Sequence, residues 1–207
     1  MNIDQFYYIK ARSSFTATIM DDSLSKHIYD LQQGNYEGIK FPVYFKHCLG
    51  TKKLREILET DFRSYLISEK VKNVLEENHL TGWKTYPIKL FYGRMVPVEG
   101  YYGFSVTGKC GAADYSKSEL LCTSLYPSGT VVKKYEGLYI NLNKWDKTDF
   151  FYPEGSPLLI VTEKVKDVLK EFNGQIEYTN LKKMITECFE FKKDKKNKSN
   201  DRVKSSI

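Results

Sequence analysis

Hydrophobic and polar positions along the chain form one distinctive pattern, and that pattern occurs twice. A short apolar run, a Ser or Thr, an acidic residue and a helical apolar spacing follow one another at residues 66–77 and again at 160–171. Seven of the twelve aligned pairs are identical. In each copy the hydroxyl side chain can cap the free amides of the first helical turn, where an acidic residue is also favourable. The pattern therefore predicts a strand followed by a capped helix in both places, with a structural role.

Outside these copies, β-branched and aromatic residues predict a chain rich in strands. The expected strands cover residues 5–10, 15–19, 101–107, 120–126, 131–135, 138–142 and 176–181, with a turn at 127–129. The strands between the two copies are typical of an antiparallel meander. A helix should begin at Ser23, as its cap, and end at Gly34, and a last helix should cover residues 181–189.

These elements predict the α+β fold class. A single domain over residues 1–190 would contain two repeated strand-helix-strand units, at about 62–90 and 156–182, that flank a β-rich antiparallel middle section. Residues 191–207 carry +5 of the formal net charge of +6, so the folded body is close to neutral. The composition of this last segment is typical of a basic, flexible tail.

Composition argues against a membrane protein, a secreted protein and a metal-binding protein. No run of about 18 apolar residues occurs, and the first residues lack the pattern of a signal peptide, so we expect a cytoplasmic protein that does not cross a membrane. The four cysteines are scattered, without a Cys-x-x-Cys pair or a histidine at zinc-ligand spacing. Free thiols, and neither a metal site nor a disulfide framework, are the expectation.

Motifs that would indicate catalysis are missing from the sequence. The three histidines lie in no recognisable motif, and no nucleophile elbow, phosphate-binding loop or dinucleotide fingerprint is present. We therefore assign no catalytic residue and no cofactor. Two alternatives stay open: an enzyme with a carboxylate-lined cleft for a small molecule, and a nucleic-acid-binding module that uses the basic tail.

The order of several short motifs resembles a known family. These motifs are a Tyr-Tyr strand at 101–106, Asp114 with Ser118, a strand at 138–141, Asp149 with two aromatic residues, and the second strand-cap-helix copy. This order resembles the immunity proteins of bacterial polymorphic toxin systems, and the first copy with Thr81-Gly82 resembles that family's other unit. The resemblance covers most of residues 54–178. One departure is Asn173-Gly174, where members of the family often have Thr-Gly.

The resemblance implies a small cytoplasmic protein that binds a cognate toxin and blocks it. Such binding needs a complementary surface and no catalytic set. The aromatic segment 145–153 can be read either as core anchors or as a partner surface. The candidate partner-binding residues come from the non-repeated middle of the chain, and they are Tyr101, Tyr102, Asp114, Ser118, Trp145, Asp146 and Asp149.

Overall fold

The computed structural model describes residues 3–12, 15–50, 54–125 and 130–190. In this part of the chain, strands predominate, and the α-helices are α1 (Ile28–Gln33), α2 (Glu69–Glu77) and α3 (Glu163–Val168). Short 3₁₀ segments cover Ile3–Gln5, Asp22–His27, Tyr115–Lys117, Leu142–Lys144, Leu169–Phe172 and Leu181–Lys183. The fold is mixed α+β, as the sequence predicts. None of the helices in the described ranges is long and apolar enough to span a membrane.

The first sheet closes into a six-stranded barrel. Its strands, in spatial order, are β3 (Val43–Gly50), β2 (Phe15–Ile19), β4 (Ile57–Thr60), β5 (Tyr65–Ser68), β8 (Tyr101–Val106) and β6 (Trp83–Tyr92). The barrel is closed because β3 also pairs with β6. A further short strand, β7 (Val96–Val98), pairs antiparallel with the last residues of β6. Inside it, the ring of Tyr86 lies over Gly103, where a Cβ atom would come within 2.0 Å of the ring. The barrel is therefore filled by side chains.

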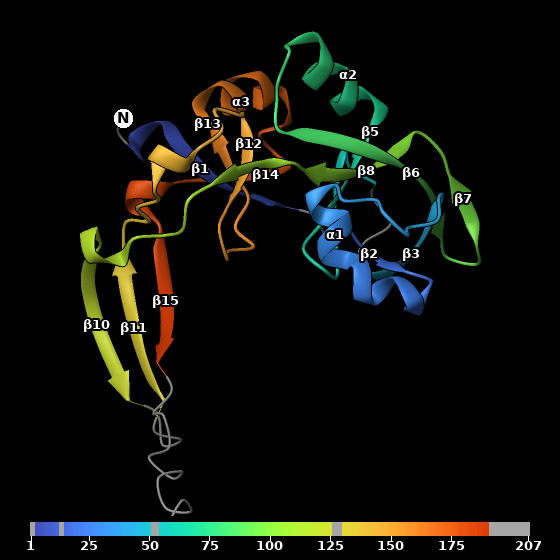
Figure 1. The fold of residues 1–207 in the computed structure, drawn as a ribbon. Helices are drawn as coiled ribbons and strands as arrows, with labels where there is room; N and C mark the ends of the chain where they lie inside the picture. The colour runs from blue at the N-terminus through green and yellow to red at the C-terminus, as the bar shows by residue number, and fades with distance from the viewer. Residues whose placement is uncertain (1–2, 13–14, 51–53, 126–129, 191–207) are drawn as a thin grey trace, which may run out of the picture.

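The second sheet has five strands and packs against the barrel (Figure 1). Its order is β14 (Ile176–Asn180), β1 (Phe6–Ala11), β13 (Ile160–Thr162), β12 (Phe150–Pro153) and β9 (Gly108–Cys110). One hydrophobic core joins the two sheets, because Ile67 and Phe104 of the barrel pack with Phe150 and Val161 of this sheet. The helices α2 and α3 contribute to the same core through Leu75 and Val165.

The third sheet projects from the body as an arm (Figure 1). It consists of β10 (Glu119–Leu125), β11 (Val131–Glu136) and β15 (Ile185–Glu190), all antiparallel, with β11 in the centre. The outer strands β10 and β15 each have one edge that pairs with no other strand in the described ranges.

Both copies of the repeated sequence contain a strand followed directly by a helix: β5 with α2, and β13 with α3. The strands β5 and β6 lie on either side of β8, and the strands β13 and β14 lie on either side of β1. The equivalence of two whole strand-helix-strand units stays a prediction.

Several local expectations are wrong. Residues 185–190 form strand β15, where a helix over 181–189 was expected, because they pair with β11 along its whole length. The expected strand at 138–142 is reduced to an isolated bridge between Ala113 and Ile140. Asp21 and not Ser23 caps the first helical segment, whereas Gly34 ends α1 in a left-handed conformation, as predicted.

The antiparallel meander predicted for the middle of the chain is confirmed for β10 and β11, which are antiparallel neighbours, and is wrong for the other strands. The strands β8, β9 and β10 belong to three different sheets, and β9 runs parallel to β12. The predicted turn at 127–129 and the predicted tail at 191–207 lie outside the described residues.

Candidate functional site

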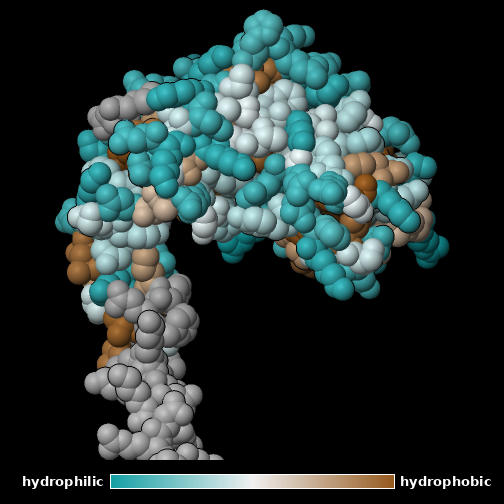
Figure 2. Space-filling model, in the orientation of Figure 1, coloured by the Kyte–Doolittle hydropathy of each residue, from teal (hydrophilic) through white to brown (hydrophobic). Residues whose placement is uncertain are grey.

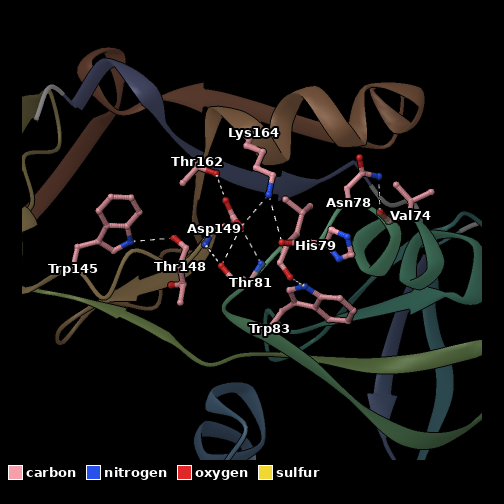
Figure 3. A network of polar contacts seen from close by, with 11 residues as sticks. Val74, Asn78, His79, Thr81, Trp83, Trp145, Thr148, Asp149, Thr162 and Lys164 are labelled. Carbon is pink, nitrogen blue, oxygen red and sulfur yellow. Dashed lines mark hydrogen bonds and ion pairs between the residues drawn. The ribbon is translucent and has the colours of Figure 1, made fainter.

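A network of polar contacts around Asp149 joins the barrel to the five-stranded sheet (Figure 3). The carboxylate of Asp149 accepts hydrogen bonds from the backbone amide and the hydroxyl of Thr81, at 2.9 and 3.0 Å. It also accepts one from the hydroxyl of Thr162, at 3.0 Å. The ammonium of Lys164 lies 4.0 Å away and is half exposed. Because only 9% of Asp149 is exposed, its hydrogen bonds are made almost entirely within the chain.

Backbone contacts fix the position of this carboxylate. The amides of Asp149 and Phe150 both donate to the carbonyl of Thr81, and the amide of Thr162 donates to the carbonyl of Asp149. Gly82 follows with a φ of 83°, and a Cβ atom there would lie 2.2 Å from the carbonyl oxygen of Phe150. The connection between α2 and β6 can therefore approach β12 this closely only with glycine at position 82.

A second carboxylate makes an equivalent set of contacts at the start of α2. The hydroxyl of Ser68 donates to the carboxylate of Glu56, and the amide of Ser68 donates to the carbonyl of the same residue. Ser68 also accepts from the amide of Val71, which caps the helix, whereas Thr162 makes no such bond to α3. Each cap residue is thus held by an acidic residue upstream.

Two more of the predicted site residues, Trp145 and Asp146, are held by contacts with Thr148 and with residues of other segments. Trp145 is buried, packs edge-on against Phe6 with ring centroids 5.1 Å apart, and donates from its indole nitrogen to the carbonyl of Thr148. Asp146 is exposed, but its carboxylate accepts from the amide of Lys109 at 2.8 Å and from the hydroxyl of Thr148 at 2.6 Å. Of the two readings of segment 145–153, its buried aromatic rings support that of core anchors.

The Tyr-Tyr pair lies on the barrel, on β8. The hydroxyl of Tyr101 donates to the carbonyl of Arg55, and burial raises the pKa of Tyr101 to about 12. The ring of Tyr102 is half-buried below the ammonium of Lys72, at 5.0 Å. Both tyrosines therefore contribute to packing and leave part of their surface accessible.

Asp114 and Ser118 lie at the base of the arm, on either side of a 3₁₀ turn. Hydrogen bonds from Ser116 hold the pKa of Asp114 below its usual range, and Lys117 forms an ion pair with it at 3.3 Å. Asp114 lines a groove of about 720 Å³ with Lys117, Tyr139 and Glu154, among other residues.

A second groove of about 540 Å³ shares Lys117 and Tyr139 with the first. It also contains Ser118, Glu119, Glu136 and Lys183. The two grooves adjoin each other at the foot of the arm, and both are lined by lysines and by acidic residues.

The carboxylates of the larger groove lie close to lysines. In the larger groove the carboxylates of Asp114 and Glu154 are each ion-paired with a lysine, at 3.3 and 3.9 Å. In the ranges that the structure describes, no group of three His, Cys, Asp or Glu side chains could hold a metal ion.

Sequence reasoning missed the exposed edge of the arm. Leu120, Leu121 and Leu125 of β10 are 51%, 43% and 67% exposed, and Ile185 of β15 is 60% exposed. Figure 2 shows hydrophobic residues along the outer side of the arm. A signal was present, because a strand with three leucines and a single charged residue is unusual at a solvent-exposed position, but the sequence could not show that β10 is an edge strand.

The chain matches the model of a known protein family. Residues 26–184 match the family described as Immunity protein family (Imm11), which is more than half of the chain. No curated protein matches the chain. The matched range includes the Asp149 network and the arm strands β10 and β11. It also includes every strand of the barrel other than β2. The chain therefore belongs to the Imm11 immunity protein family.

Proposed function

We propose that this protein neutralises a cognate bacterial toxin by stoichiometric binding, in the cytoplasm of the cell that makes both proteins. Membership of an immunity protein family over residues 26–184 is the observation that carries this proposal. An inhibitor of this kind acts by covering or distorting its target, and it needs a complementary surface of roughly 800 Å² on each partner.

The surface features of the described residues support binding more than chemistry. The arm exposes apolar side chains, and the grooves at its foot contain charged groups of both signs. Of the predicted contacts, Tyr101, Tyr102, Asp114, Ser118 and Asp146 are at least partly exposed and stay candidates for partner contacts, although the hydroxyl oxygen of Ser118 is itself buried. Trp145 and Asp149 are buried, so their surroundings favour a role in positioning the surface.

No observation favours the two alternative functions. The carboxylates that line the larger groove are neutralised by lysines, which does not favour an acid-base pair. Nucleic-acid binding was assigned to residues 191–207, which lie outside the described residues.

Co-expression tests the proposal. The toxin domain encoded beside this protein should kill or arrest cells when expressed alone and leave them viable when this protein is co-expressed. The purified pair should elute as one complex with a fixed ratio of the two chains. An unrelated toxin from another system is the matched control and should still kill. Equal loss of viability with and without this protein would refute the proposal.

A further inference from the structure

The strand β10 has an unusual edge. All seven of its residues are exposed, and it pairs only with β11 in the described part of the chain. Natural proteins protect such edges with lysine, proline or very short strands, because free backbone groups invite another strand to pair. β10 contains neither lysine nor proline, and its only charged residue, Glu119, lies at its first position. A bulge is a further protective device, and the register of β10 with β11 is irregular between Leu120 and Cys122. The regularly paired part that follows, Cys122 to Leu125, therefore has an edge open to strand addition.

The base of this strand also contains an unfavourable charge pair. Glu119 lies directly opposite Glu136 of β11, and like charges at such cross-strand positions are destabilising. Neither carboxylate forms an ion pair with a residue in the described ranges. A strand added to the free edge of β10 would bring a side chain next to Glu119, on the side away from Glu136. A Lys or Arg at that position would offset the repulsion.

A toxin fits this edge better than a second copy of the chain does. β10 contains no basic residue, so pairing with the β10 of a second copy cannot place a cation beside Glu119. The three exposed leucines also provide less area than the roughly 800 Å² per partner of a stable complex. A partner that covers both β10 and the adjoining 540 Å³ groove could reach that area.

We propose that the cognate toxin adds a β-strand to the free edge of β10 and places a basic side chain opposite Glu119. This inference rests on the proposed function and specifies its binding mode. The backbone of β10 supplies the hydrogen bonds, and its exposed leucines supply apolar contacts for alternate side chains of the incoming strand.

The experiment measures binding of the toxin domain encoded beside this protein to full-length variants by titration calorimetry. Leu125→Lys should weaken binding about tenfold or more, because a charged side chain disrupts the apolar cross-strand contacts. Its matched control is Ile185→Lys, which changes a similarly exposed side chain, 60% against 67%, on the opposite edge of the arm and should leave the affinity unchanged. Amide hydrogen exchange in residues 119–125 should slow on binding.

Glu119→Lys gives the sharpest readout, because the free chain and the complex should respond with opposite signs. The free chain should become more stable, since the substitution replaces a like-charged cross-strand pair by an opposite-charged one. The affinity for the toxin should fall. This combination excludes loss of folding as the cause of weaker binding.

Three results would overturn the inference while the proposed function stands: unchanged affinity in Leu125→Lys and Glu119→Lys, unprotected β10 amides in the complex, or equal weakening by Ile185→Lys. A free protein that is dimeric, and that Leu125→Lys makes monomeric, would assign the edge to a second copy and also overturn it. Failure of the wild-type protein to bind the toxin domain would instead refute the proposed function itself.

Discussion

Asp149→Ala should destabilise the fold strongly. The substitution removes three hydrogen bonds to a charged acceptor, from the amide and hydroxyl of Thr81 and from the hydroxyl of Thr162. Hydrogen bonds to charged groups contribute about 1.5–3 kcal/mol each, but losses within one network are not additive. The ion pair with Lys164 adds little, because that lysine is half exposed. We expect a loss of about 3 kcal/mol in the free energy of unfolding, since a buried donor is left without its acceptor.

Urea denaturation checks this value, and a chain of this size should also lose about 6–12 °C in melting temperature. Asp167→Ala is the matched control, because Asp167 is exposed on α3 and its removal should change stability by less than about 0.5 kcal/mol. Thr162→Val, which removes one of the three donors, should cost about 1 kcal/mol. A loss below about 1 kcal/mol in Asp149→Ala would refute the view that this carboxylate holds the two sheets together.

Three further predictions concern the helix cap, the barrel interior and the thiols. Ser68→Ala removes the cap of α2 and the bond to Glu56, and denaturation should show a loss of about 1–2 kcal/mol; an unchanged midpoint would contradict this role. Tyr86→Phe should leave the stability of the fold unchanged or raise it slightly, because the buried hydroxyl has no hydrogen-bond partner in the described ranges. Gly103→Ala should instead destabilise the fold by about 1–3 kcal/mol, because the added methyl group would overpack against the same ring. Burial raises the pKa of the Cys110 thiol to about 11, so at pH 8 alkylation followed by mass spectrometry should label the exposed Cys122 and spare Cys110; equal labelling rates in the folded protein would contradict it.

The sequence predicts those elements whose signals are contiguous. In residues 66–77 and 160–171 the strand, the cap position and the helical face all lie within twelve positions, and the structure contains β5 with α2 and β13 with α3 there. The end of the chain shows the limit. Leu181, Met184, Ile185 and Cys188 have the spacing of a helical face, so a helix was expected. Residues 185–190 of this segment instead form the strand β15. Pairing with β11, about fifty residues earlier in the chain, decides between helix and strand.

The site shows the same limit. Asp149 was selected as a partner contact because it adjoins aromatic residues, but its hydrogen-bond donors come from Thr81 and Thr162, one of them 68 residues away. No local pattern reveals that a carboxylate is satisfied by such distant groups. The edge position of β10 was hidden for the same reason, since it depends on the order of strands in the arm.

The contrast between Asp149 and β10 suggests how an immunity protein can keep its frame while its target changes. Replacing a buried carboxylate with three internal donors costs enough stability to endanger folding, so the network that joins the two sheets constrains the residues in it. Substitutions at exposed positions of β10 should cost less than about 0.5 kcal/mol each, because these side chains contribute little to the core. Replacing Glu119, which lies opposite Glu136, should even stabilise the fold, because it removes a like-charged pair. The Asp149 network thus belongs to the part of the chain that the fold needs, whereas the proposed contact with a toxin lies on a strand whose side chains contribute little to the core.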